Sequence, residues 1–497
     1  MTAIITEKFR QHNAEQFFES FSETSSTTYY LFIGKSLPYT TGTTGGNDSA
    51  PPTPADSVSG EFYNWDAMLA AKKIPSTDVS FALPRVNFSN GTIYDMYDDT
   101  ISSSNTTTSG ASSLYAGNFY FITSTNNVYK VLDNNGGAAY SGSEPSNTGT
   151  TPFASGGYIL KYMYNVTASE ATKFLTTDYM PVSTDTTVSA AAVDGKIESL
   201  VITPGSGYTN GTYYAPVFGD GTSQGTSSGG IIRITVSGGA IASFGLTAGT
   251  DTTIHAGGAA YTFGNVSLTN VFSDAALSSS ASMGSGTGAA VRIVISPKEG
   301  HGNDAVKELG GHFVITNTTL AQAEGDDLTT ANDFRQVGIV TDPYNFGTTT
   351  VASSSTARMT YVVKMSSASG TFDVDEEITQ ATTGAVGRVV EWDASRSLLY
   401  YSQERFSTYG TAATTQSYTA FSGTNTITGS TSNATGTPSS TSSETVTLAA
   451  GNTVAFTSGY ANPELQPDSG NIVYIENRKP IQRVSDQTED IKIIIEF

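Results

Sequence analysis

Cysteine is absent from this sequence of 497 residues. No disulfide framework, thiolate metal site or cysteine nucleophile is therefore possible. Charged residues are scarce, at 14 %, and positive ones scarcer still: 24 Lys and Arg stand against 45 Asp and Glu, a formal net charge of −21. Because a negative field repels phosphate backbones and anionic lipid heads, the charge argues against nucleic acid and membranes as partners.

Long apolar runs are missing too. No stretch of the sequence approaches the ~18 apolar residues that a membrane span needs. Residues 1–8 have neither the charged start nor the apolar core of a signal peptide. We therefore expect a protein that crosses no membrane and is synthesised in the cytoplasm.

What the sequence does contain is Gly, Ser, Thr and Asn, set between short stretches rich in Val, Ile, Thr, Tyr and Phe. This pattern is typical of many short strands joined by turns. The chain exceeds the roughly 250–300 residues at which single cores stop growing. We predict a mainly β (α+β), multidomain protein with β-sandwich-like domains and a few short helices.

Four short helices are predicted. Residues 7–22 place Phe17, Phe18 and Phe21 on one helical stripe, and residues 65–73 suggest a second helix. A third is expected over residues 168–176, where Thr167 and Glu170 have the spacing of a capping box. Residues 304–309 followed by two glycines predict the fourth, with a glycine C-cap.

The clearest predicted strand is the apolar run from Tyr29 to Gly34, which suits a strand buried on both faces. Asn126 and Asn127 suit a tight hairpin. Residues 359–405 alternate as strands do and predict another small β unit. Residues 407–450 are almost wholly Thr, Ser, Gly, Ala and Asn, so they form either short surface strands or a partly disordered segment.

The middle of the chain contains an internal repeat, with copies near residues 194–237 and 238–297. Each copy is expected to open and close with a strand, and Ser237-Gly238-Gly239 joins them. We interpret the repeat as an inserted, peripheral β domain that is dispensable for the core fold. The ends of such an insertion should lie close together.

The C-terminal segment, Ile472 to Phe497, predicts two strands with a turn at Asn477–Pro480. These strands should close the core domain that the N-terminal residues begin. Alternation predicts a buried face on each strand. Its members would be Val473, Ile475, Ile491, Ile493 and Ile495.

Few residues are candidates for catalysis or for binding a metal ion. His301, Asp304 and His312 come nearest to a metal or acid–base cluster, but a polar loop explains them better. The carboxylates of Asp373–Glu377 suit Ca²⁺ or a glycosidase pair, yet the glycine and glutamate of a calcium-binding EF-hand are missing there. Asp95, Asp98 and Asp99 are best explained as a polar loop. We assign no catalytic, cofactor-binding or metal-ligating residue and expect no enzyme and no cofactor.

Several segments carry a resemblance. In chain order they are Thr6–Arg10, Phe32–Tyr39, Ala50–Val58, Phe334–Pro343, Ile472–Arg483 and Asp486–Ile491. They are similar to the dimeric baseplate-wedge protein family of T-even-like contractile-tailed phages (myoviruses). The resemblance covers roughly residues 1–183 and patches from 334 onward, and leaves out the repeat.

The resemblance implies a structural subunit of the virion tail baseplate. It implies a β-rich homodimer that links the inner wedge scaffold to peripheral baseplate components, contacts other wedge proteins and moves as a rigid body when the baseplate rearranges. It offers no catalytic residues, no cofactor and no small-molecule substrate. The alternative is a tail-associated adhesin that binds or cleaves host glycans, suggested by the repeat, the tyrosines and the Asp373–Glu377 carboxylates.

The chain is expected to divide into six segments. The core domain would comprise an N-terminal part, a return to the core and the closing C-terminal strands. Between them lie a β-rich wedge domain, the inserted tandem β repeat, and a small β unit with a Ser/Thr/Gly-rich surface segment. In chain order the boundaries are 1–93, 94–183, 184–300, 301–345, 346–465 and 466–497.

Overall fold

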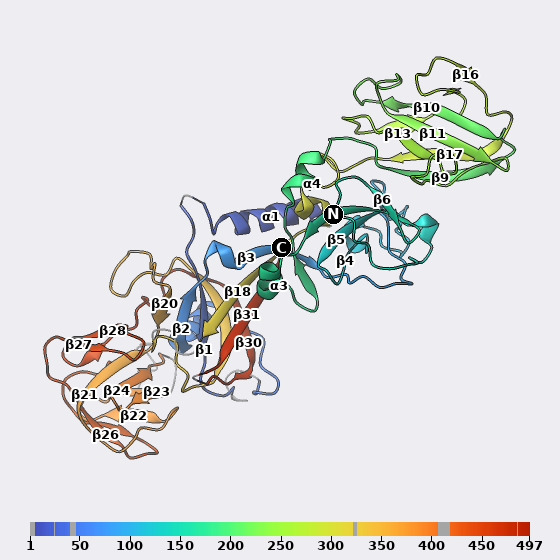
Figure 1. Ribbon diagram of the computed structural model, residues 1–497. Coiled ribbons are helices and arrows are strands. Elements are labelled where there is room, and N and C mark those ends of the chain that lie inside the picture. The colour runs from blue at the N-terminus through green and yellow to red at the C-terminus, as the bar shows by residue number, and fades with distance from the viewer. Residues whose placement is uncertain (1–4, 24, 40–45, 322–325, 406–417, 485) are drawn as a thin grey trace. The chain divides into compact units, whose positions relative to one another are not determined.

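The computed structural model describes residues 5–23, 25–39, 46–321, 326–405, 418–484 and 486–497 (Figure 1). The protein is mainly β with antiparallel sheets, which confirms the predicted fold class. Within these ranges no helix has the length and apolar character to span a membrane. The α-helices are α1 (Glu7–Glu19), α2 (Val58–Ala67), α3 (Ala168–Phe174), α4 (Thr186–Ala191) and α5 (Ala305–Leu309).

The chain forms two compact units. Unit 1 contains residues 1–16, 80–315 and 494–497, and unit 2 contains residues 17–79 and 316–493. One four-stranded sheet has the order β31-β18-β3-β8. Its strands are β3 (Val79–Pro84), β8 (Tyr179–Pro181), β18 (Phe313–Ala321) and β31 (Thr488–Glu496).

The main sheet of unit 2 has five strands in the order β20-β2-β1-β19-β30. They are β1 (Tyr29–Gly34), β2 (Met68–Lys73), β19 (Phe334–Thr341), β20 (Thr356–Arg358) and β30 (Asn471–Ile481). All six residues of β1 are buried, which confirms the predicted core strand. Strands from both ends of the chain thus share one sheet.

The helix predicted over residues 65–73 is wrong. Helix α2 ends at Ala67, and the following residues form strand β2. Met68 to Ala71 are buried, and the strand pairs with β1 on one side and β20 on the other. Pairing on both edges outweighs the helix preference of the two alanines, because intrinsic propensity is only a weak prior.

The second part of unit 2 is a closed barrel of six strands. Its order is β24-β23-β22-β25-β26-β21, and β21 pairs back with β24. The strands are β21 (Tyr361–Ser369), β22 (Glu377–Gln380), β23 (Val386–Asp393), β24 (Leu398–Ser402), β25 (Ile427–Gly429) and β26 (Thr435–Pro438). Short strands flank the barrel: β29 (Tyr460–Ala461), which pairs with β21, and the pair β27 (Glu444–Thr447) and β28 (Thr453–Phe456).

The barrel confirms the β unit predicted over residues 359–405. In the described part of the Ser/Thr-rich stretch, β25 and β26 are strands of the barrel rather than surface strands, and Ile427 is fully buried. Low apolar content hid these strands, because each contributes few side chains to the core. Residues 406–417 lie outside the described part.

The central sheet of unit 1 has the order β4-β5-β7-β6. The strands are β4 (Tyr120–Ile122), β5 (Asn127–Asp133), β6 (Phe153–Ser155) and β7 (Tyr158–Asn165). Apolar clusters pack against both faces of this sheet. The predicted hairpin joins β4 to β5, and α3 has the capping box that Thr167 and Glu170 predict.

The repeat region of unit 1 forms one domain with a single core. Its strands are β9 (Ser199–Ser206), β10 (Gly211–Gly219), β11 (Ile231–Ser237), β12 (Ala240–Ile241), β13 (Thr253–Ala256), β14 (Gly264–Val266), β15 (Val271–Phe272), β16 (Ser280–Ala281) and β17 (Thr287–Val294). Gly238 and Gly239 form the joint, a two-residue hairpin loop with both φ angles positive, for which glycine is suited. We call residues 194–297 the insert.

The ends of the insert lie together, as predicted. Strand β9 pairs antiparallel with β17, so that Ser199 is opposite Val294. The first strand of one repeat copy therefore pairs with the last strand of the other. This pairing explains why the two copies form one domain.

The C-terminal prediction is right about the strands and wrong about the turn. Asn477–Pro480 lies inside β30, and the connection to β31 follows Ile481. Val473 is 51 % exposed, whereas Ile493 is 3 % exposed. Since β30 lies at the edge of its sheet, its alternation did not reveal a deeply buried face.

This difference in burial yields a test of the C-terminal strands. Ile493→Ala should lower the free energy of unfolding by about 2–5 kcal/mol, because the cavity lies in packed surroundings. Val473→Ala, its matched control on the exposed face, should change it by less than about 0.5 kcal/mol. Urea denaturation measures both, and equal losses would contradict the burial described here.

Candidate functional site

The least expected feature of unit 1 is a pair of buried lysines. Lys130 on β5 and Lys161 on β7 are directly opposite each other in the sheet. They are 0 % and 2 % exposed. Like charges placed opposite each other destabilise a sheet, so each ammonium requires an anion.

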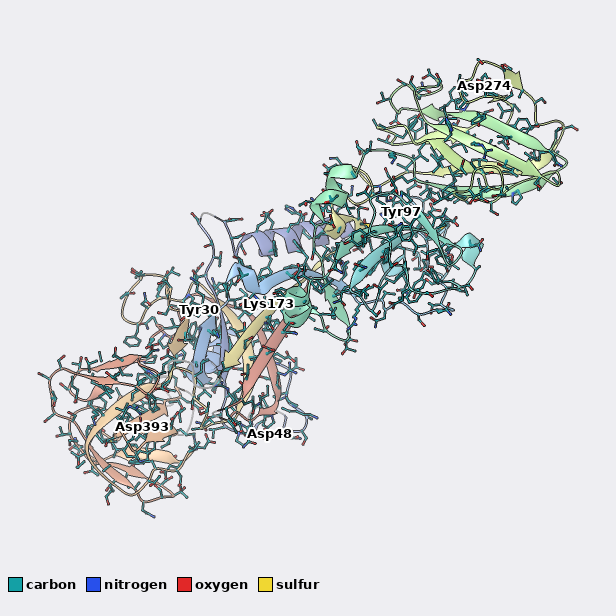
Figure 2. All side chains as sticks on the ribbon, viewed as in Figure 1. Tyr30, Asp48, Tyr97, Lys173, Asp274 and Asp393 are labelled. Atoms are coloured by element: carbon teal, nitrogen blue, oxygen red, sulfur yellow. The ribbon has the colours of Figure 1, made fainter. Side chains whose placement is uncertain are left out.

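Glu308 on α5 supplies the anion for Lys130. Its Oε2 lies 2.9 Å from Lys130 Nζ, and its Oε1 accepts a hydrogen bond from the Gly302 amide. Lys130 Nζ also lies 2.9 Å from His301 Nδ1 and 4.0 Å from the ring centre of Tyr97, which Figure 2 labels. Because an ammonium can only donate, Nδ1 accepts and the imidazole carries its proton on Nε2.

Glu198, at the start of the insert, supplies the anion for Lys161. Its Oε2 lies 3.2 Å from Lys161 Nζ, and its Oε1 lies 2.9 Å from Lys196 Nζ. The next residue, Ser199, donates from its hydroxyl to the Leu132 carbonyl at 2.6 Å. We call Lys130, Lys161, Glu198, His301 and Glu308 the buried charge cluster.

The far end of the insert is fixed by other groups. Arg292 on β17 pairs with Asp98, and the Ile295 amide donates to Asp99 Oδ1 at 3.2 Å. Two of the three aspartates predicted as a polar loop therefore hold the insert. Removing residues 194–297 would leave Lys161 without Glu198, and the dispensability of the insert stays a prediction.

Burial and charge shift the pKa values of the cluster. Burial lowers the pKa of Lys130. Burial and the neighbouring Lys130 lower the pKa of His301 to about 4, so the imidazole is neutral. Burial alone would raise the pKa of Glu308, but Lys130 and His301 outweigh it and bring the value to about 2. The cluster therefore holds two ammonium–carboxylate pairs around a neutral imidazole.

This arrangement has a structural role, because it holds three segments of unit 1 together. Its side chains are acid–base groups, but every member is 7 % exposed or less, so a substrate has no access to them. The cluster brings together the start of the insert, the central sheet and the segment that follows the insert. It thereby fixes where the insert leaves the sheet.

The two histidines that came nearest to a cluster in the sequence, His301 and His312, have separate partners. His301 belongs to the charge cluster. His312 donates from Nδ1 to the Gly310 carbonyl at 2.8 Å, and its Nε2 lies 3.3 Å from Arg10 Nη1. Helix α5 itself is confirmed, with Asp304 as N-cap and Gly310 as a left-handed C-cap. His301 lies in the turn before α5, in line with a loop that contains a short helix, but its side chain is buried.

The carboxylates of Asp373–Glu377 do not converge on a ligand. Glu376 accepts hydrogen bonds from the amides of Asp373, Thr431 and Ser432 and so anchors a barrel turn. The described ranges contain no group of three or more His, Asp or Glu side chains placed to hold a metal ion. Sequence reasoning missed Lys130, Lys161, Glu198 and Glu308, although a lysine inside an apolar strand run was a usable signal.

The cluster predicts a loss of stability in mild acid. His301 has a folded pKa of about 4, below its ordinary 6.5, so the unfolded chain binds more protons between these values. The stabilisation is complete above pH 6.5 and is lost as the pH falls toward 4. His301→Asn retains an acceptor near Lys130 but does not titrate. Between pH 7 and pH 5 its free energy of unfolding should fall by about 2 kcal/mol less than that of the wild type.

Urea denaturation at the two pH values measures this difference. His255→Asn is the matched control, because His255 is exposed in the insert. If His301→Asn and the wild type lose the same free energy, the histidine is not held neutral by the cluster.

Comparison with known proteins finds one family that matches part of the chain. The family described as Bacteriophage T4, Gp8 matches residues 3–137 and 441–497. No curated protein matches the chain. The first matched segment supplies β1 and β2 and the second supplies β30, so both contribute to the five-stranded sheet of unit 2. This family comprises baseplate wedge proteins of T4-like phages, which are components of the virion baseplate, and the chain matches it through its two ends.

Proposed function

We propose that the protein is a homodimeric wedge subunit that links the inner wedge scaffold to peripheral baseplate components and moves as a rigid body when the baseplate rearranges. The observation that carries this proposal is the family match at both ends of the chain. The matched segments are far apart in sequence, yet they share one sheet through β19. A common folded core is therefore the part that this chain shares with the family.

Rigid-body movement is supported by how each unit is internally braced. In unit 1 the buried charge cluster connects the insert to the central sheet. In unit 2 the barrel is closed by the β21–β24 pairing, which leaves no open edge among its six strands. Packed cores have discrete arrangements and deform little, so changes between states concentrate at interfaces.

Dimerisation is supported by the open edges of two sheets. Strands β30 and β31 are both edge strands in the described sheets. Val473, on β30, leaves an apolar side chain half exposed. The outward backbone N–H and C=O groups of an edge strand can pair with a second copy about a two-fold axis.

Antibody labelling of the virion tests the location. Gold-conjugated antibodies raised against the purified chain should mark the tail baseplate in negative-stain micrographs of intact phage. Sedimentation at micromolar concentration should give twice the 52.0 kDa of one chain. Preimmune serum and a tail-fibre antibody serve as controls for the labelling.

Two results would contradict the proposal. Label confined to the capsid would show that the protein is not part of the baseplate. Label confined to the fibre tips would show the same and is the result expected for a glycan-binding adhesin. A monomer that persists after the other wedge proteins are added would exclude the dimer.

A further inference from the structure

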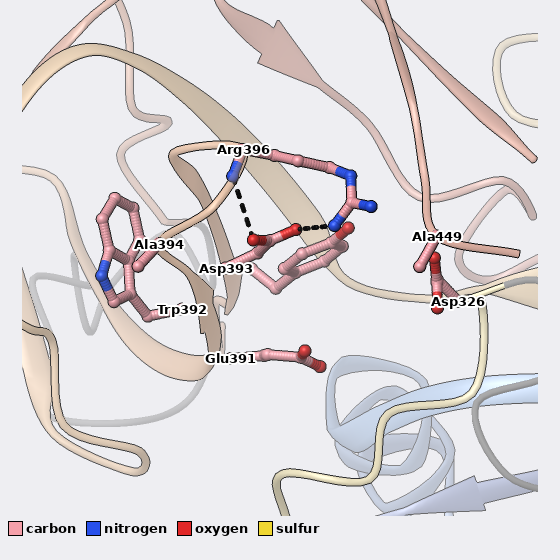
Figure 3. Close-up of a pocket in the computed structure, with 8 residues that line it drawn as sticks. Asp326, Glu391, Trp392, Asp393, Ala394, Arg396 and Ala449 are labelled. Atoms are coloured by element: carbon pink, nitrogen blue, oxygen red, sulfur yellow. Dashed lines mark hydrogen bonds and ion pairs between the residues drawn. The ribbon is translucent and has the colours of Figure 1, made fainter. Parts of the chain in front are cut away.

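A cleft of about 330 Å³ opens in unit 2, between the β23–β24 hairpin and two loops (Figure 3). Its charged lining consists of Asp326, Glu391, Asp393 and Arg396. Trp392, Tyr400, Ala394 and Ala449 complete it. Because the lining combines aromatic rings with carboxylates, it has the composition of a binding site.

Among the described residues, only one of the three carboxylates is paired with a cation. Asp393 accepts from Arg396 Nη1 at 2.8 Å and from the Arg396 amide at 3.0 Å, as the dashed lines in Figure 3 show. Arg396 Nε donates in addition to the Thr447 carbonyl at 3.1 Å. The guanidinium is thus held on the Asp393 side of the cleft.

The other two carboxylates have neutral partners. Glu391 Oε2 accepts from the Thr329 hydroxyl at 3.1 Å, and Asp326 Oδ2 accepts from the Ala450 amide at 3.3 Å. In Figure 3 the Glu391 carboxylate points toward the side of the cleft where Asp326 lies. Burial, together with the Asp393 and Asp326 charges, raises the pKa of Glu391.

Tyr400 brings a hydroxyl to the cleft. The residue is 7 % exposed and lines the cleft. Burial and the Glu391 charge raise the pKa of this hydroxyl. A tyrosine oxygen can accept a hydrogen bond from a bound molecule.

From this geometry we infer that the cleft binds a basic side chain, best an arginine, presented by a partner protein. A guanidinium offers five N–H donors and no acceptor. The open positions of the cleft are mainly acceptors: Asp326, Glu391 and the Tyr400 oxygen. The planar group can also pack on the ring of Tyr400. This inference rests on the proposed function, which supplies neighbouring proteins in the baseplate.

An uncharged saccharide is the competing occupant, because aromatic rings and carboxylates also bind sugars. It would leave the two carboxylates without a counter-charge, whereas a guanidinium neutralises them. Charge complementarity therefore favours the basic side chain. The saccharide becomes an outcome of the test.

The probe is the capped tripeptide acetyl-Gly-Arg-Gly-amide, titrated into the full-length protein at low salt. Its control is the same peptide with citrulline, which has the shape of arginine without the charge. Trp392 reports binding by fluorescence, since the only other tryptophan, Trp65, is buried in the core of the five-stranded sheet. Calorimetry on the same samples gives an independent affinity.

We expect the arginine peptide to bind and the citrulline peptide to bind at least about 10-fold more weakly, because a charged hydrogen bond is lost. Asp326→Asn and Glu391→Gln should each weaken binding of the arginine peptide about 10-fold. The double variant Asp56→Asn/Glu61→Gln removes two exposed charges elsewhere and should leave binding unchanged. Binding should also weaken as salt is raised to 150 mM.

Equal binding of the two peptides, unchanged affinity in Asp326→Asn and Glu391→Gln, or binding of maltotriose in place of the arginine peptide would overturn the inference. Because the citrulline and salt comparisons use the unmodified chain, they remain decisive if a variant fails to fold. A protein that labels the baseplate but does not bind the arginine peptide overturns the cleft inference alone. A protein that binds the peptide but labels outside the baseplate overturns the proposed function alone.

Discussion

The burial of two lysines opposite each other on β5 and β7 is the constraint on which unit 1 depends. Neither ammonium can remain in that position without an anion, and both anions come from outside the sheet. Glu198 lies at the start of the insert and Glu308 lies in the helix after it. The charges therefore require the insert to leave and rejoin the sheet at one place. A buried ion pair adds little net stability, but breaking it is costly. The cluster therefore acts mainly by favouring this one arrangement of insert and sheet over other arrangements.

Unit 2 achieves order by closure and by apolar packing. Strand β21 pairs with β24 in its first half and with β26 in its second half, and this completes the barrel. Strand β1 is buried in the middle of the five-stranded sheet. The Gp8 match covers the N-terminal and C-terminal strands of that sheet, whereas all six barrel strands and all of the insert lie outside it. The core shared with the family and the added domains are therefore formed by different segments of the chain.

Local signals in the sequence predicted local structure well. The capping box at Thr167 and Glu170, the glycine joint at Gly238 and the apolar run of β1 each act over a few residues, and each was confirmed. The helix predicted over residues 65–73 failed because sheet pairing on both sides of β2 decided its structure. The turn predicted at Asn477–Pro480 failed because an edge strand tolerates proline and charge where its outer side is unpaired.

Sites that combine residues distant in the sequence could not be predicted from it. Lys130 and Glu308 are 178 residues apart, and Lys161 and Glu198 are 37 apart. The arginine-binding cleft combines Asp326 with a hairpin at 391–400 and a loop at 449. No periodicity or spacing connects such segments, because the contact exists only after the sheet and barrel have formed. A lysine embedded in an apolar run is the sole trace of the cluster in the sequence, and it does not name its partner.

A double-mutant cycle on Lys130 and Glu308 tests most directly whether the two buried charges depend on each other. It uses Lys130→Met, Glu308→Gln and the double variant. Each single variant should lose about 3–5 kcal/mol of unfolding free energy, because it leaves one buried charge unpaired. The double variant should lose less than the sum of the two single losses by about 2 kcal/mol or more. A double variant whose loss equals that sum would show that the two charges do not depend on each other, and would contradict the account.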